Sequence, residues 1–256
     1  MLIERDVRVD LRDIQSCLRA GIESRAVEVG PFLVLFNDGS DNPFSNYAVP
    51  VDGAAPTADD VRALIDFFHG RQRLPRLEYV RPAPTVDEPL SAAGFDVAGT
   101  LTLMALDDEL TPAPPADGYR VALITDVPSL RQAVAVQNTA YGEGDREPNP
   151  GGLVRTIEGG GRVAVAVHEA TDQPAGAGLS TEPQGGLVEI AGVGVLAQHR
   201  RHGVGALVTW ALTNEALRRG HQPFLQVEKD EPFRVYQRLG YRVVGEMADA
   251  RRPVAD

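Results

Sequence analysis

The stretch GGLVEIAGVGVLAQHRRHGVGALVTWALTNEALRRG, residues 185–220, decides the fold. Its first part, residues 185–197, is a long apolar run of the kind that forms a buried strand at the centre of a sheet. From about Gly203 to Arg219 apolar residues recur at helical spacing, and Gly220 supplies a left-handed stop. The stretch therefore predicts a central strand, a basic loop that contains glycine, and an amphipathic helix.

The loop Arg200-Arg-His-Gly203-Val-Gly205-Ala206 has the composition of a phosphate site. Its glycines let the backbone approach a ligand, and the first N–H groups of the following helix have no partner within that helix. These donors and the helix dipole attract an anion such as a pyrophosphate. The loop lacks the Gly-Lys-Ser/Thr of a Walker loop and the third glycine of a Rossmann fingerprint. A basic helix start without a ligand is the alternative.

The flanking sequence predicts a β-α-α-β-β-β-α-β-α-β order, which indicates an α/β fold. Before the central strand we expect a strand at 118–124, helices at about 126–141 and 153–158, and strands at 162–170 and 175–182. After the long helix we expect a strand at 222–228, a short helix at 231–240 and a strand at 241–247.

A weak internal repeat divides the chain near its middle. The pattern Leu90-x-x-Ala93-Gly94-Phe95-x-Val97-x-Gly99 recurs as Tyr236-x-x-Leu239-Gly240-Tyr241-x-Val243-x-Gly245. A segment rich in proline and acidic residues lies between the two copies. We therefore predict a domain at 1–108, a linker at 109–117 and a second domain at 118–256. A chance match of a common helix, glycine and strand ending is the alternative.

Composition excludes several classes of protein. The chain has 256 residues, 43% of them hydrophobic, and no apolar run approaches the roughly 20 residues of a membrane span. The single cysteine, Cys17, is expected to be a small buried residue, and no His/Cys cluster has metal-binding spacing, so no metal is expected. The charged N-terminus does not resemble a signal peptide, which favours a cytoplasmic protein.

The charge is unevenly distributed. The net charge is −11, which argues against a nucleic-acid partner. Residues 1–110 hold 10 Arg and 19 acidic residues, whereas residues 111–256 hold 15 basic and 17 acidic ones. The second half is therefore where an anion is tolerated, and the acidic first half favours a cationic ligand, such as a cationic acceptor for a group-transfer reaction. An acidic surface that only keeps the protein in solution is the alternative.

Two motifs in this order resemble those of the GNAT superfamily of N-acetyltransferases. Val193-Gly-Val195 followed by Arg200-x-x-Gly203-x-Gly205 is similar to the family's central strand and its Arg/Gln-x-x-Gly-x-Gly/Ala loop. Tyr236-x-x-x-Gly240-Tyr241 is similar to the family's Tyr-x-x-x-Gly-Phe/Tyr ending, and the resemblance covers about residues 118–248. It implies two GNAT-like units, each a mixed, mostly antiparallel twisted sheet flanked by helices. In the second unit it implies a splay between the central strand and the 222–228 strand.

The resemblance implies acetyl-CoA as the donor. Main-chain N–H groups of about Arg201 to Ala206 would hold its pyrophosphate, and Val193 to Val195 would lie along its pantetheine. The family often has an asparagine before the tyrosine, and here Asp230 or Lys229 takes its place or the contact is lost. The implied donor-binding residues are Val193, Gly194, Val195, Arg200, Arg201, His202, Gly203, Val204, Gly205, Ala206 and Asp230. The first copy lacks the loop motif and has Leu90 in place of the tyrosine, so we expect it to bind no CoA.

Two residues are candidates for the chemistry. An amine with a pKa of about 10 is protonated at neutral pH, so a base must remove its proton before attack. Some GNAT enzymes carry a glutamate where Glu189 lies, acting directly or through water; a solvent-facing strand residue is the alternative. Tyr236 occupies the place of the family's general acid, which serves the leaving thiolate; a core tyrosine is the alternative.

The resemblance therefore implies transfer of acetyl to a primary amine of a small molecule by direct attack in a ternary complex. A CoA-binding, sensing or structural protein whose chemistry has lapsed is one alternative, and a protein acetyltransferase is another. No nucleic acid and no membrane is expected as a partner, and a homodimer stays open.

Overall fold

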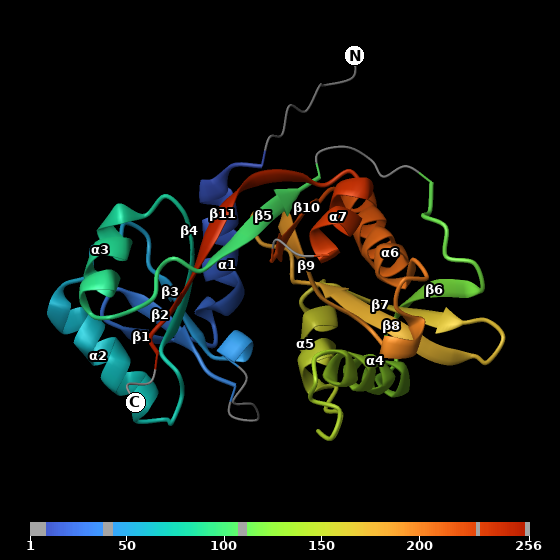
Figure 1. Cartoon of the computed structure of the whole chain (residues 1–256), viewed down its shortest axis with the longest axis horizontal. Coiled ribbons are helices and arrows are strands. Elements are labelled where there is room, and N and C mark those ends of the chain that lie inside the picture. The colour runs from blue at the N-terminus through green and yellow to red at the C-terminus, as the bar shows by residue number, and fades with distance from the viewer. Residues whose placement is uncertain (1–8, 38–42, 107–111, 229–230, 254–256) are drawn as a thin grey trace, which may run out of the picture. The chain divides into compact units, whose positions relative to one another are not determined.

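The computed structural model of the chain describes residues 9–37, 43–106, 112–228 and 231–253. These residues form two compact units (Figure 1). The C-terminal unit is built from Met104–Val243, and the N-terminal unit from Asp10–Leu103 together with the chain from Val244 onward. The boundaries fall inside strands β5 (Thr100–Ala105) and β11 (Arg242–Arg251), so each of these strands contributes residues to both units.

The compact units differ from the contiguous domains 1–108 and 118–256 that the sequence predicts. The chain from Val244 joins the N-terminal unit because β11 pairs antiparallel with β4 (Arg76–Val80), with Met247 opposite Val80 and Arg251 opposite Arg76. A pairing between strands so distant in sequence leaves no trace in either local pattern. Residues 109–111 of the predicted linker lie outside the described residues.

Five strands of the C-terminal unit lie in the order β10-β9-β8-β7-β6. Neighbouring strands are antiparallel except β9 and β10, which are parallel and joined by the crossover helix α6. Its elements are β6 (Tyr119–Ile124), α4 (Val127–Ala140), α5 (Gly151–Glu158), β7 (Arg162–His168), β8 (Gln173–Ser180), β9 (Leu187–Val195), the 3-10 turn η2 (Ala197–His199), α6 (Val204–Arg218), β10 (Gln222–Val227) and α7 (Glu231–Arg238).

Helices cover both faces of this sheet, because alternate residues of each strand are apolar on opposite sides. Val163 and Val165 pack with Leu130 of α4 and Leu153 of α5 on one face. Ala164 and Ala166 pack on the other face with α6, as does the partly buried Tyr236 of α7. Figure 1 shows the two helix pairs on either side of β6 to β9. The predicted α/β architecture, a mostly antiparallel sheet flanked by helices, is confirmed.

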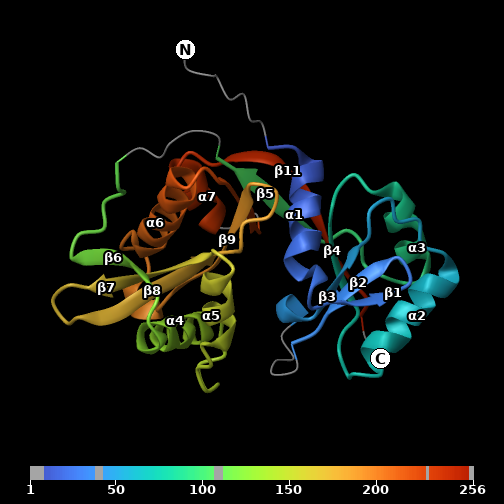
Figure 2. The same ribbon diagram turned by 180° about the vertical axis from the view of Figure 1, so that it is seen from behind.

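The N-terminal unit has a sheet in the order β1-β2-β3-β4-β11. Helices α2 and α3 pack on one face, and α1 packs against β2, β3 and β4 on the other (Figure 2). Cys17 of α1 is buried, as predicted. The elements are α1 (Leu11–Glu23), β1 (Val27–Val29), β2 (Phe32–Leu35), the 3-10 turn η1 (Pro43–Ser45), β3 (Tyr47–Pro50), α2 (Ala58–His69), β4 and α3 (Pro84–Ala92).

The same order of elements occurs in both units, which supports the predicted repeat. The series β1-β2-β3-α2-β4-α3 matches β7-β8-β9-α6-β10-α7, and each has two antiparallel pairs followed by one parallel pair. The strand that follows each series along the chain pairs with a strand of the other series. β11 follows α7 but pairs with β4, and Leu106, just after β5, donates its N–H to the Pro223 carbonyl of β10 at 3.3 Å.

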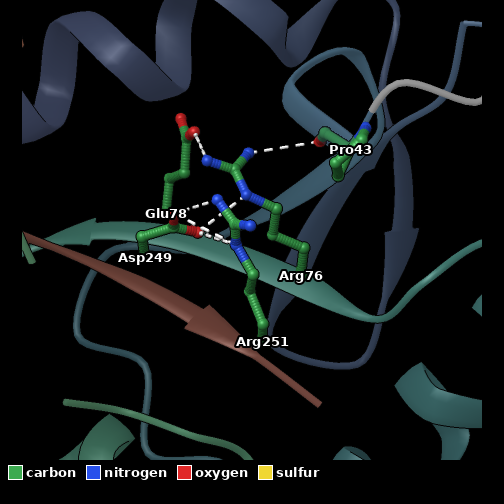
Figure 3. Close-up of polar contacts among 5 residues, drawn as sticks. All are labelled: Pro43, Arg76, Glu78, Asp249 and Arg251. Carbon is green, nitrogen blue, oxygen red and sulfur yellow. Dashed lines mark hydrogen bonds and ion pairs between the residues drawn. The ribbon is translucent and has the colours of Figure 1, made fainter. Parts of the chain in front are cut away.

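A buried group of charges fixes β11 on β4 (Figure 3). The Arg76 guanidinium is fully buried, donates from Nε to Asp249 Oδ1 at 2.7 Å, and pairs with Glu78. Arg251 donates to the same Asp249 carboxylate at 3.1 Å, and Arg76 also donates to the Pro43 carbonyl at 3.2 Å. The positive charges of the two arginines therefore balance the negative charges of Glu78 and Asp249 within the N-terminal unit.

Within the described residues, no helix has the length and apolar character that crossing a bilayer requires. The same residues contain no group of three or more His, Cys, Asp or Glu side chains arranged to hold a metal ion.

Candidate active site

A cavity of about 430 Å³ opens where the C-terminal ends of β9 and α4 meet the start of α6. It brings together the strand segment, the glycine loop and the tyrosine of the two sequence motifs, all within the C-terminal unit. Its lining consists of Ala140, Tyr141, Val193, Gly194, Val195, His199, Arg200, Arg201, Gly203, Val204, Gly205, Ala206, Val235 and Tyr236.

The cavity exists because β9 parts from β10. The two strands pair only from Leu187 opposite Gln222 to Glu189 opposite Phe224, although both continue further. On its other side β9 bulges against β8, since Ala191 opposes Leu179 but Gly194 opposes Ala177. Gln137 of α4 donates from Nε2 to the Gly192 carbonyl at 2.8 Å and holds this bulge. The splayed central strand pair predicted from the sequence is therefore present.

The start of α6 faces the cavity with free hydrogen-bond donors. Gly203 occupies the N-cap position in a left-handed conformation, with a φ of 79°, and provides no side-chain acceptor to the first turn. The N–H groups of the first helical turn have no intrahelical acceptor, so they and the helix dipole favour an anion. A Cβ on Gly203 would lie 2.4 Å from the Pro115 carbonyl oxygen, so this turn requires glycine.

Gly205 is needed for a different reason. A Cβ at this position would meet only the Val195 side chain, at an ordinary contact distance of 3.6 Å. The fold itself therefore tolerates a side chain there, and the space that glycine leaves belongs to the cavity. Free donors beside such a space fit a diphosphate, so the residues present match the donor that the sequence implies.

The basic residues of the loop have separate positions. Arg200 donates from Nε to the Val195 carbonyl at 3.2 Å and from Nη2 to the Ala140 carbonyl at 3.5 Å, so its side chain ties β9 to the end of α4. Arg201 is exposed with a positive φ of 65° and lines the cavity. His202 is exposed and is not one of the lining residues.

Two tyrosines border the cavity. Tyr236 of α7 is partly buried, and burial, with a smaller contribution from Tyr141, raises its pKa to about 12. Tyr141, which follows the last residue of α4, donates from its hydroxyl to the Val193 carbonyl at 3.3 Å. Sequence reasoning missed Tyr141, although its position at the end of a predicted helix, directly before Gly142, was the available signal.

Glu189 is not among the cavity residues. Glu189 lies at the last paired position of β9 and β10, where the strands part, and its N–H donates to Thr181 Oγ1 at 2.9 Å. As a residue, Glu189 is partly exposed. Asp230 and Lys229 lie outside the described residues.

Comparison with known proteins supports the architecture. Residues 162–249 match the family model described as FR47-like protein, and no curated protein matches the chain. A GCN5-related N-acetyltransferase from Kribbella flavida is 24% identical with a TM-score of 0.76, and 96% of each chain is covered.

Two further solved structures share this fold. A GNAT-family protein from Novosphingobium aromaticivorans is 19% identical with a TM-score of 0.61, covering 98% of this chain and 100% of that one. A tandem GNAT protein from the clavulanic acid biosynthesis pathway is 16% identical with a TM-score of 0.58, covering 90% and 83%. The chain thus has the GCN5-related N-acetyltransferase fold that its two motifs predict, with an FR47-like match that covers β9, α6 and α7 at the cavity.

Proposed function

We propose that this protein transfers an acetyl group from acetyl-CoA to a primary amine of a small molecule, by direct attack in a ternary complex. The fold, whose solved relatives are named N-acetyltransferases, supports an acyltransferase. The observation that carries the proposal is the uncapped start of α6, which opens onto a cavity that ends at Tyr236.

The chain's own residues can hold such a donor along the length of the cavity. N–H groups of Val204, Gly205 and Ala206 bind the pyrophosphate, and the parted edge of β9 at Val193 to Val195 lies beside the pantetheine. The donor supplies an activated acyl group as a thioester. The bulge that Gln137 holds keeps the β9 edge open for it.

The proposed role of Tyr236 follows from its protonation state. With a pKa of about 12, its phenol stays protonated throughout the neutral range and can donate a hydrogen bond. An alkyl thiol has a pKa of about 8.5, so a phenol this weakly acidic stabilises the leaving sulfur mainly by donating a hydrogen bond.

Glu189 is the proposed base for the amine. It lies where β9 and β10 separate but is not among the residues that line the donor cavity, so it acts through a water molecule from the acceptor side.

The N-terminal unit is proposed to bind no CoA. Its counterpart of α6 is α2, whose N-cap Thr57 forms a capping box with Asp60, so side-chain oxygens already accept from the N–H groups of Thr57 and Asp60. Asp59 and Asp60 in the first turn add negative charge where an anion would sit. The start of α2 thus has a side-chain cap and acidic residues in its first turn, whereas the start of α6 has neither.

Titration calorimetry with coenzyme A, followed by acetyl-transfer assays on a panel of cationic, neutral and acidic amines, tests the proposal. We expect binding of one coenzyme A per chain and turnover that is fastest with cationic amines. Absence of binding contradicts the whole proposal. Binding without turnover of any amine, peptides included, favours a CoA-sensing protein, and turnover of peptides alone favours a protein acetyltransferase.

A further inference from the structure

Three of the five histidines of the chain gather around one tyrosine beside the glycine loop. The ring centroid of Tyr119 lies 5.2 Å from that of His168, 5.6 Å from that of His199 and 6.1 Å from that of His202. The rings of His168 and His199 are 5.7 Å apart. We call these four residues the histidine cluster.

Hydrogen bonds orient two of the imidazoles. The Tyr119 hydroxyl bonds to His199 Nδ1 at 3.0 Å, and His168 Nδ1 bonds to Thr171 Oγ1 at 3.0 Å. Within the described residues, these bonds leave the Nε2 atoms of both rings without a hydrogen-bond partner. The Nε2 atoms are therefore the positions from which a protonated cluster could donate to a ligand.

The cluster lies at the end of the site that is remote from Tyr236. Tyr119 begins β6 and His168 ends β7, and these strands form the edge of the sheet opposite β10, after which α7 and Tyr236 follow. His199 and His202 lie in the loop that leads into α6, and His199 lines the cavity. The order across the site is Tyr236, then the free donors of α6, then the histidine cluster.

Coenzyme A has the same order of chemical groups. Its thioester is at one end, its pyrophosphate is in the middle, and a phosphomonoester on the adenosine ribose is at the other end. If the thioester lies at Tyr236 and the pyrophosphate at α6, the remaining phosphate falls at the end where the cluster lies. A phosphomonoester is a dianion at neutral pH and accepts several hydrogen bonds.

The charge around the cluster favours an anion. The first turn of α6 carries no acidic residue, and His199 feels the charges of His168 and His202. Burial first, and then these two neighbours, lowers the pKa of His199, and a bound anion would act in the opposite direction. The other charged residues near the cluster are Arg120, Glu169, Asp172, Arg200 and Arg201. Of these, Arg120 and Asp172 form an ion pair with each other.

We propose that the histidine cluster is the subsite for the phosphomonoester of the acyl donor, and that it takes up a proton when the donor binds. This inference rests on the proposed function. The proton comes from the buffer and is held between an imidazole nitrogen and a phosphate oxygen, so no covalent bond forms or breaks. The cluster thereby distinguishes coenzyme A from its analogue without the 3′-phosphate, dephospho-coenzyme A.

Calorimetry with these two ligands tests the subsite, in buffers of different ionisation enthalpy at about pH 6 and about pH 8, below and above the ordinary imidazole pKa of about 6.5. We expect coenzyme A to bind at least about tenfold more tightly than dephospho-coenzyme A at the lower pH, the worth of a charge-assisted hydrogen bond. This ratio should shrink at the higher pH, and only coenzyme A should show a binding enthalpy that depends on the buffer.

Variants separate the cluster from general effects of charge. The triple variant His168→Gln, His199→Gln, His202→Gln should bind both ligands alike and take up no proton, whereas His221→Gln, a histidine outside the cluster, should behave as the wild type. Circular dichroism verifies that the variants are folded. If the triple variant does not fold, the single variants His199→Gln and His202→Gln replace it in the same measurements. Equal binding of both ligands by the wild type, without proton uptake, overturns the subsite and leaves the proposed function intact. Binding of neither ligand overturns both.

Discussion

At the scale of single residues, Tyr236 and Tyr141 border one cavity but differ in what their hydroxyl groups do. The hydroxyl of Tyr141 already bonds to the Val193 carbonyl, whereas no such bond engages the hydroxyl of Tyr236 within the described residues. Partial burial keeps the pKa of Tyr236 at about 12. The two phenols should therefore respond differently to the same substitution.

Tyr236→Phe should lower kcat by at least about tenfold and leave the affinity for coenzyme A unchanged, because the lost hydrogen bond acts on the departing sulfur. The wild-type rate should show no decline from tyrosine ionisation up to about pH 10, since the phenol remains protonated below its folded pKa. Steady-state kinetics combined with calorimetry checks both points. An unchanged kcat would remove Tyr236 from the chemistry.

Tyr141→Phe should instead raise the affinity for the donor by about two- to threefold, the worth of one weak exposed hydrogen bond. The reason is that the Tyr141 hydroxyl occupies the Val193 carbonyl, an acceptor on the strand edge along which the pantetheine amides would lie. Calorimetry measures the change, with Tyr236→Phe as the matched control. A weaker affinity would show that Tyr141 contacts the donor directly.

The sequence predicted much of the site at this scale, but only where a motif carried it. Arg200, Gly203, Gly205 and Tyr236 were identifiable because their spacing is distinctive, and the structure brings them to one cavity. Tyr141, His168 and Tyr119 belong to no motif. Their relevance depends on strand ends that meet in space, and a linear pattern does not record which ends meet.

At the scale of elements, the start of α6 is the feature on which donor binding depends. Gly203 and Gly205 lie in the same loop but serve different purposes, as the surroundings of a hypothetical Cβ show. One glycine is required by the backbone, and the other leaves room for a ligand. Substituting each by alanine separates folding from binding.

Gly203→Ala should lower the free energy of unfolding by more than about 1–2 kcal/mol, the penalty for a left-handed non-glycine residue, because its Cβ also meets the Pro115 carbonyl. Gly205→Ala should keep or raise that free energy, since alanine favours a helix, but weaken donor binding by at least about tenfold through the loss of a charge-assisted hydrogen bond. Urea unfolding and calorimetry measure the two effects. Equal loss of stability in both variants would contradict the distinction.

The charge group that joins β4 and β11 makes a second prediction at this scale. Burial raises the pKa of Asp249, but hydrogen bonds and charges from Arg251 and Arg76 outweigh it, and the net pKa lies below its ordinary value. The ionised form of Asp249 therefore contributes stability above about pH 4, and this contribution is lost as the pH falls through the folded pKa. The pKa of Glu78 shifts in the opposite direction, because burial raises it and the charge of Arg76 offsets this only in part.

Asp249→Asn should lower the free energy of unfolding by about 3 kcal/mol, because it leaves buried guanidinium charge uncompensated. The control is Asp172→Asn, which breaks the ion pair between Asp172 and Arg120. The side chain of Arg120 is 53% exposed and that of Asp172 is 79% exposed, so this variant should change the free energy of unfolding by less than about 0.5 kcal/mol. Urea unfolding at neutral pH measures both. A loss below about 1 kcal/mol for Asp249→Asn would show that the group contributes little to stability.

At the scale of the whole molecule, the order of elements was predictable and the partners of the last strands were not. Apolar periodicity located β9, α6 and β10 within a few residues, because each has a strong local pattern. The pairing of β11 with β4 depends on Arg76, Glu78, Asp249 and Arg251 meeting across two strands. Neither the charged pair on β4 nor the one on β11 indicates this pairing in the sequence, because the charges meet only when the two strands lie side by side.

This pairing predicts which fragments fold. Residues 1–108 alone lack β11 and should not unfold cooperatively, since Arg76 and Glu78 lose Asp249 and β4 loses a neighbour. Residues 10–103 joined by a glycine-serine linker to residues 244–253 should regain a cooperative transition. Thermal melts followed by circular dichroism compare the two fragments. A cooperative melt of 1–108 alone would show that β11 is dispensable.

The exchanged strand also has a consequence for how the protein is made. A nascent chain leaves the ribosome from its N-terminus, and domains fold as they emerge. The N-terminal unit of this protein cannot do so, because β11, the strand that completes its sheet, is translated only after the C-terminal unit. Its sheet edge at β4 waits through the synthesis of the entire C-terminal unit, so a stalled or truncated message yields a chain that lacks a finished N-terminal unit.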